Sequence, residues 1–165
     1  MQFTRFIRHL FTPPAITRRR FGPAVATGIS TAIRAAESRS SGEVRFAVET
    51  GLGIAELWAG LSPRERALQV FSHLAVWNTE LRNGVLIYVL VADRDVEIVA
   101  DRGVAARVDP ADWERASRLM EDHFRARRFR EGAVAGVEAV GELLARHFPA
   151  GPENRDELPN QPTLL

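Results

Sequence analysis

The pattern of apolar and polar positions divides the chain into extended and helical segments. The clearest extended pattern lies in residues 83–104, where the eight residues Val85–Ala92 carry no charge. An uncharged run of this length predicts a strand that is covered on both faces. Residues 96–100 form a second apolar strand, and only residues 93–95 separate the two. We therefore predict an antiparallel hairpin.

A different extended pattern lies earlier in the chain. In Glu43–Glu49, apolar Val44, Phe46 and Val48 alternate with charged positions. This period of two predicts a strand with one solvated face.

Helical periodicity and start signals predict five helices. Ser62, followed by Pro63 and Glu65, forms a capping box, and Asp109 before Pro110 is a second N-cap signal. The expected helices cover residues 3–11, 23–36, 63–75, 110–124 and 130–148.

The order of these elements predicts the fold class. A helix between the first two strands favours a parallel crossover pair, and the hairpin adds an antiparallel neighbour. We predict an α/β fold, a three-layer α/β/α sandwich whose small mixed sheet is covered by helices on both faces. We expect a basic amphipathic arm at residues 1–22, one domain at residues 23–148 and a disordered tail at residues 149–165.

The net charge of +1 conceals an uneven distribution. Residues 1–36 hold six arginines and no acid, whereas residues 37–165 hold sixteen arginines against twenty-one acids, a net charge of −5. All 22 basic residues are arginine and there is no cysteine, which excludes lysine chemistry, disulfides and thiolate zinc sites. The acidic body does not favour nucleic-acid binding.

The arm predicts a docking surface. Phe3 and Phe6 share one side of an amphipathic helix, and Arg5 and Arg8 lie on the other. Such a helix binds an anionic membrane surface or a membrane protein, or it packs on the core of its own domain. No segment has the length of a membrane span. A twin-arginine-like segment at residues 17–21 resembles an export signal by chance, and we predict a cytoplasmic protein that is peripheral at the membrane. The predicted docking residues are Phe3, Arg5, Phe6, Arg8, Arg18, Arg19 and Arg20.

Polar residues at the ends of the hairpin strands suggest a metal site. Asn83, Asp93 and Asp101, together with Asp95, supply the oxygen ligands that calcium or magnesium prefers. The alternative is that these acids are solvated turn residues paired with neighbouring arginines. The four histidines have no metal-ligand spacing, and nucleotide motifs are absent, so we predict no zinc, haem or nucleotide cofactor.

The order of several short motifs resembles the TPM domain family. They are Ser-Gly-Glu before the first strand, Arg82-Asn83-Gly84 before the second, the Asp93-Arg94 turn, a loop at Gly103, and Phe129-Arg130-Glu131-Gly132. The resemblance covers roughly residues 23–148.

The resemblance to TPM domains implies an α/β/α sandwich, divalent-metal binding in some members and acid phosphatase activity in a plant member. By position it points to Asn83, Asp93 and Asp101. Arg82 replaces an acid that is common before Asn-Gly, and Asp101 replaces the first glycine of a Gly-x-Gly loop.

We therefore expect a module that binds a divalent cation and docks a partner or membrane, without strong catalysis. The alternatives are a metal-dependent acid phosphatase and a pure protein-interaction module.

Overall fold

The computed structural model describes residues 2–151 and 156–165, and it contains one mixed sheet. Its strand order is β3-β2-β1-β4, in which β1 pairs in parallel with β2 and β4, and β2 pairs in antiparallel fashion with β3. The strands are β1 (Glu43–Glu49), β2 (Gly84–Leu90), β3 (Asp95–Ala100) and β4 (Thr163–Leu164).

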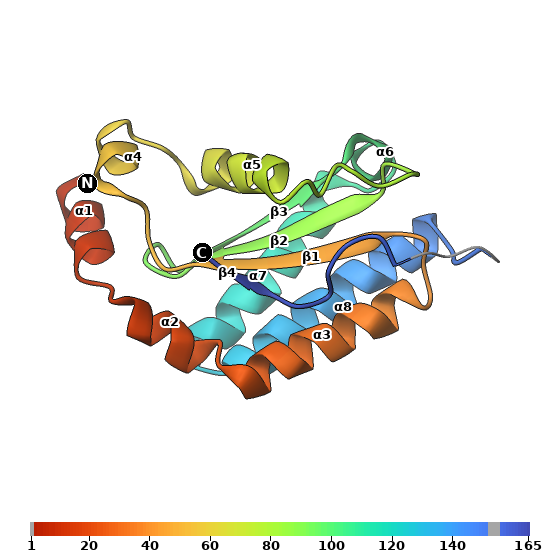
Figure 1. Cartoon of the computed structure of the whole chain (residues 1–165), viewed down its shortest axis with the longest axis horizontal. Coiled ribbons are helices and arrows are strands. Elements are labelled where there is room, and N and C mark those ends of the chain that lie inside the picture. Colours follow the sequence, from red (N-terminus) through yellow and green to blue (C-terminus); the bar gives the residue numbers. More distant parts are fainter. Residues whose placement is uncertain (1, 152–155) are drawn as a thin grey trace.

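Helices cover both faces of this sheet, as Figure 1 shows. One face carries α3 (Pro23–Glu37), α7 (Pro110–Arg125) and α8 (Phe129–His147), and the other carries α5 (Pro63–His73). The predicted α/β/α sandwich with a parallel pair and a hairpin is confirmed.

Local start signals operate as predicted. The Ser62 hydroxyl accepts a hydrogen bond from the Glu65 amide at 3.2 Å, and the Glu65 carboxylate accepts one from the Ser62 amide at 2.8 Å. At α7, the Asp109 carboxylate accepts a hydrogen bond from the Ala111 amide at 2.8 Å. These bonds satisfy amide groups that the first turn of a helix leaves without a partner.

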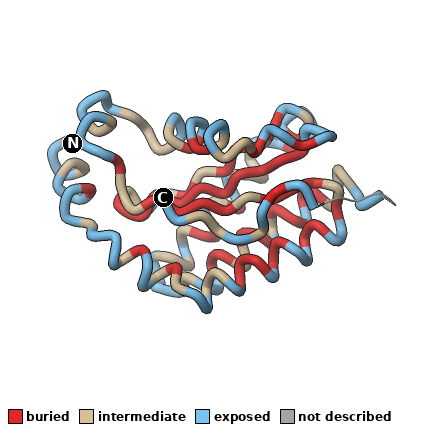
Figure 2. The backbone as a smooth tube through the Cα atoms, in the orientation of Figure 1, coloured by how far each residue is buried: buried red, intermediate tan, exposed pale blue. Residues whose placement is uncertain are grey.

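Strand β2 is buried along its whole length, as its uncharged sequence predicts (Figure 2). Strand β1 differs from the prediction, because Glu43 and Glu49 are buried as well as the apolar residues. Its second face is covered by α5 and by the end of the chain, where Leu158 joins the apolar cluster around Tyr88. The alternating pattern predicted the strand correctly, but the face that it predicted to be solvated is largely buried.

The end of the chain differs from the expected disordered tail. Residues 152–155 lie outside the described part, but Thr163 and Leu164 form β4 beside Ala47 and Val48. The guanidinium of Arg45 donates hydrogen bonds to main-chain carbonyls of this segment, one of them that of Gln161 at 2.9 Å. The composition is typical of disorder, but long-range contacts with β1 order the segment.

The basic arm folds into two short helices, α1 (Gln2–Leu10) and α2 (Pro14–Arg20). They lie beside the end of the sheet where β1 and β2 finish (Figure 1). Helices α2, α4 (Ile54–Trp58) and α6 (Arg102–Ala105) are too short for their periodicity to be recognised in the sequence. Within the described residues, no helix has both the length and the apolar character that a membrane span requires.

Candidate functional site

The structure separates the four predicted metal ligands into two pairs. Asn83 precedes β2 and Asp101 follows β3, and the Asp101 amide donates a hydrogen bond to the Gly84 carbonyl at 2.9 Å, so both lie at one end of the sheet. Asp93 and Asp95 lie at the opposite end, in the β2–β3 turn and at the first position of β3. A strand of seven residues is about 20 Å long, and a single ion therefore cannot contact both pairs.

Asp93 holds the N-terminal arm against the domain. Its carboxylate accepts hydrogen bonds from Arg5 at 2.9 Å and from Arg8 at 3.3 Å, and the Nε2 atom of His9 lies 3.0 Å away. Burial raises the pKa of Asp93, but hydrogen bonds from Arg5 and His9 outweigh this effect and hold the pKa below its ordinary value. The carboxylate of Asp93, which the sequence suggested as a metal ligand, is thus surrounded by three cationic or donor groups of the arm.

Asp95 lies in a different environment. Burial, together with the nearby carboxylates of Glu97, Glu121 and Asp93, raises the pKa of Asp95 to about 6. The raised pKa reflects a local excess of negative charge around a half-buried side chain.

Asn83 and Asp101 both organise the backbone around them. The Asn83 side-chain amide donates to the Ser41 carbonyl, and Asp101 caps α6 by accepting a hydrogen bond from the Arg102 amide at 2.6 Å. One oxygen on each side chain, Oδ1 of Asn83 and Oδ2 of Asp101, is buried without a hydrogen-bond partner among the described residues. The two residues therefore retain acceptor capacity at this end of the sheet.

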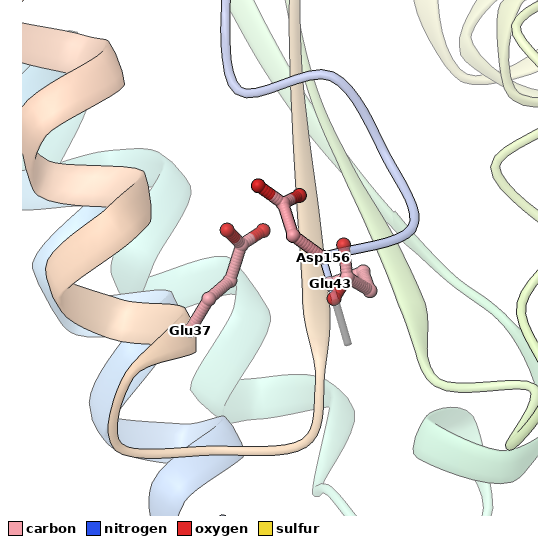
Figure 3. Close-up of side chains that lie close together, drawn as sticks. All are labelled: Glu37, Glu43 and Asp156. Carbon is pink, nitrogen blue, oxygen red and sulfur yellow. The ribbon is translucent and has the colours of Figure 1, made fainter. Parts of the chain in front are cut away.

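An acidic cluster that the sequence patterns did not indicate lies at the same end. Figure 3 shows Glu37 at the end of α3, Glu43 at the start of β1, and Asp156 from the end of the chain pointing toward one another. One carboxylate oxygen of each lies within 4.8 Å of the others. Burial and the nearby Glu43 and Asp156 raise the pKa of Glu37 to about 8, against the lowering effect of the Val44 amide.

Backbone amides support this acidic cluster. Oε1 of Glu37 accepts a hydrogen bond from the Val44 amide at 3.0 Å, and Oε2 of Glu43 accepts from the amides of Glu157 and Leu158 at 3.1 and 3.0 Å. The cluster could not be found from spacing, because it depends on the contact between β1 and a segment more than a hundred residues later.

The predicted docking residues divide into exposed and engaged side chains. Phe3, Arg8, Arg18 and Arg19 are exposed. The other three are half-buried: Arg5 binds Asp93, Phe6 contacts the Trp58 ring edge to face at a centroid distance of 6.0 Å, and Arg20 lies over the Phe129 ring at 5.1 Å.

Known proteins share this architecture. The family model of the TPM domain matches residues 19–143. The BA42 protein from the psychrophilic bacterium Bizionia argentinensis, solved by NMR, is 35% identical, with a TM-score of 0.74 over 86% of this chain and 93% of that chain. The N-terminal domain of a protein from P. gingivalis is 22% identical, with a TM-score of 0.60 over 79% of this chain and 82% of that chain, and shows likeness of fold. No curated protein sequence matches the chain.

Proposed function

We propose that this chain, which belongs to the TPM domain family, docks on an anionic membrane surface through helix α1. We propose no strong catalysis. The observation that carries this proposal is the orientation of α1. Its polar residues Arg5 and His9 face the domain and contact Asp93, whereas its apolar residues Phe3, Ile7 and Leu10 are exposed. A helix that packed on its own core would have the opposite orientation.

The outward face is large and aromatic. Phe3 is 76% exposed, Leu10 59% and Phe11 74%, and Trp58 of the adjoining α4 is 79% exposed. A groove of about 330 Å³ opens between α1 and α4, with Phe3, Phe6 and Trp58 among its walls. Aromatic side chains on the apolar face of a short amphipathic helix are typical of proteins that bind the membrane interface.

The charge around this face favours an anionic membrane over a neutral one. Arg8, Arg18 and Arg19 are exposed, and residues 1–36 contain no acid. A basic residue near an anionic membrane contributes about 1 kcal/mol to binding. Such a role agrees with a cytoplasmic, peripheral protein, because the cytoplasmic leaflet carries anionic lipid.

Sedimentation of the full chain with vesicles tests the docking. We expect binding to vesicles that contain phosphatidylglycerol, weaker binding to pure phosphatidylcholine, and a decrease with salt. The double variant Phe3→Ser and Phe11→Ser should lower the partition coefficient at least about tenfold, since burial of one such ring contributes about 1.5–3 kcal/mol. The control Leu81→Ser alters a side chain that is 60% exposed and distant from α1 in sequence. Equal binding by the double variant and the control contradicts the proposal.

A second candidate function, divalent-cation binding, is favoured by the acidic cluster of Glu37, Glu43 and Asp156. Burial and, to a smaller extent, the charges of Glu43 and Asp156 raise the pKa of Glu37, and a bound calcium or magnesium ion would offset the part that comes from these charges. The partnerless buried oxygens of Asn83 and Asp101 lie at the same end of the sheet and offer further hard ligands. Of the predicted ligands, Asn83 and Asp101 thus stay candidates for a separate site at this end of the sheet, whereas the acidic cluster contains neither Asp93 nor Asp95.

Amide NMR during calcium, magnesium and manganese titrations tests cation binding. We expect shifts at residues 37–43 and 156–158 that Glu43→Gln weakens and Glu114→Gln, on an exposed part of α7, does not. Shifts lost in Asp101→Asn but kept in Glu43→Gln would place the ion at Asn83 and Asp101 and contradict the acidic cluster. Unchanged spectra would favour the pure interaction module.

The metal-dependent acid phosphatase stays an alternative prediction. The cluster of Asn83, Asp93 and Asp101 on which it was based is divided between two ends of the sheet, so the activity would need the acidic cluster instead. Turnover of an aryl phosphate that requires a divalent cation and is lost in Glu43→Gln would support it. Lack of turnover with all three cations would contradict it.

A further inference from the structure

Three arginine side chains from distant parts of the chain line one pocket of about 380 Å³. Arg20 ends α2, Arg94 lies in the β2–β3 turn and Arg127 lies in the loop between α7 and α8. The fold therefore brings three positive charges to the same cavity at the end of the sheet where β2 finishes. This assembly is separate from the acidic cluster, which lies at the other end.

These three guanidinium groups have no carboxylate partner among the residues that the structure describes. The Arg20 guanidinium lies over the face of the Phe129 ring, 5.1 Å from its centroid. Burial, followed by the charges of Arg94 and Arg127, lowers the pKa of Arg20, which indicates mutual repulsion. The two other charged groups on the wall, Glu121 and Arg125, pair with each other at 3.0 Å. The pocket thus retains a concentrated and unneutralised positive charge.

The backbone at two of the three arginines is unusual. Arg94 has a φ of 58° and Arg127 a φ of 60°, in the left-handed region that favours glycine. Arg127 follows α7, and the Arg128 amide donates to the His123 carbonyl at 2.9 Å, a helix ending that ordinarily carries glycine at this position. Arginine therefore occupies two positions where the main chain disfavours a side chain, and both side chains line the same pocket.

The rest of the wall is apolar. Phe21 is buried, and Phe124 stacks on Phe129 at a centroid distance of 5.6 Å and an interplanar angle of 23°. These rings fix the floor of the pocket and exclude water from one side of the guanidinium groups, which strengthens charge-assisted hydrogen bonds.

We infer that the pocket of Arg20, Arg94 and Arg127 binds a multiply charged phosphate group, as a phosphate monoester or a pyrophosphate. Guanidinium groups bind phosphate oxygens in pairs of parallel hydrogen bonds, and a dianion or a higher anion matches three of them. A pocket of this volume accommodates a phosphate group with a small organic part against the phenylalanines. The same chemistry occurs in soluble phosphorylated molecules and in lipid phosphomonoesters.

Titration calorimetry of the full chain with pyrophosphate, and separately with inorganic phosphate, tests this inference. We expect pyrophosphate to bind more tightly than phosphate, and both to bind more tightly than chloride. Arg94→Gly and Arg127→Gly remove a guanidinium while supplying the residue that the backbone favours, so both variants should fold. Each should weaken pyrophosphate binding at least about tenfold. The control Arg118→Gln removes an exposed arginine of α7 that forms an ion pair with Glu114.

The two sources of phosphate are distinguished with vesicles. Capture by phosphatidic acid vesicles that depends on Arg94 and Arg127, without pyrophosphate binding in solution, would identify a lipid headgroup and support the inference. Pyrophosphate binding with no difference between phosphatidic acid and phosphatidylglycerol vesicles would identify a soluble ligand. Failure of both probes, or equal binding by Arg94→Gly, Arg127→Gly and the Arg118→Gln control, would overturn it. The Phe3 and Phe11 variants of α1 should leave pyrophosphate binding unchanged, so docking and phosphate binding can fail independently.

Discussion

The Nε2 atom of His9 lies 3.0 Å from Oδ1 of Asp93, although 84 positions separate the two residues in the chain. Nδ1 of the same imidazole accepts a hydrogen bond from the Leu52 amide at 2.8 Å. Because Nδ1 accepts, the proton of a neutral imidazole is on Nε2, the nitrogen that lies next to the carboxylate. His9 therefore joins the arm to two segments of the domain at once.

The variant Asp93→Asn should release this contact. Arg5, Arg8 and His9 would lose the charge that holds them, at a cost of about 1–3 kcal/mol in the free energy of unfolding. Hydrogen exchange measured by NMR should show faster exchange of the Leu52 amide. In the control Asp122→Asn, at an exposed position on α7, exchange of that amide should not change. Equal protection in the two variants would show that Asp93 does not hold the arm.

The contact between Asp93 and the arm also predicts how protection of the Leu52 amide depends on pH. The pKa of Asp93 in the folded protein lies below its ordinary value of 3.8, so its stabilising effect is complete above that pH and is lost as the pH falls through the lower folded value. The Leu52 amide should stay protected at mildly acidic pH and lose protection only below about pH 3.8. Loss of protection already near pH 6 would contradict this assignment to Asp93.

The raised pKa of Glu37 predicts the opposite dependence of stability on pH. Its folded pKa of about 8 lies above the ordinary value of 4.5, so the folded protein binds one more proton than the unfolded chain between these values. The free energy of unfolding should therefore decrease as the pH rises through this window, by up to about 1.4 kcal/mol per pH unit. Denaturant unfolding of Glu37→Gln should show a smaller decrease, because the raised pKa values of Asp95 and Glu43 still contribute. A wild-type protein whose stability is flat from pH 5 to 8 would contradict the prediction.

Adding a side chain at Gly84, in the Asn-Gly motif, should have a steric cost. A Cβ atom at Gly84 would meet the main-chain carbonyl of Val76, which cannot move as a side chain can. We expect Gly84→Ala to lower the free energy of unfolding by about 1–3 kcal/mol or more. The control Gly151→Ala places its Cβ in open space and should change stability little. Thermal unfolding that is equal in both variants would refute the steric argument.

The buried carboxylate of Glu49 predicts a ranking of two variants. Arg66 donates two hydrogen bonds to it at 2.9 and 2.8 Å, and the Tyr88 hydroxyl donates a third at 2.6 Å. Arg66→Ala leaves a buried charge without its counterion and should cost about 3–5 kcal/mol, whereas Tyr88→Phe should cost about 1–2 kcal/mol. Chemical denaturation measures both, and the reverse order would contradict this account.

The sequence predicts the sheet better than the site because strands and helices follow local patterns. The capping residues Ser62 and Asp109 and the uncharged β2 strand need no distant contact to be recognised. Whether the predicted metal ligands meet depends on distances between side chains in the folded chain. The length of β2 alone separates Asn83 from Asp93. The antiparallel register, with Val85 opposite Ala100, then brings Asp101 to the Asn83 end.

The acidic cluster and the arginine pocket could not be predicted for a different reason. Asp156 reaches Glu43 only because the end of the chain packs along β1, and its composition is typical of disorder. Arg20, Arg94 and Arg127 share no spacing, and their meeting depends on how α2 and the α7–α8 loop pack around the hairpin turn. The outward orientation of α1 was equally hidden, because an amphipathic pattern specifies two faces without stating which one contacts the domain.

Strand β4 covers part of an edge of the sheet that would otherwise be open to other strands. It pairs with the outer side of β1, and Leu165 donates a further hydrogen bond to the Val48 carbonyl at 2.9 Å. Without this segment, β1 would present a free row of amide and carbonyl groups, which recruits strands from other molecules. Residues 156–165 thus cover part of the β1 edge, and a cleavage that removed them would expose main-chain groups of Ala47 and Val48 to pairing with another strand.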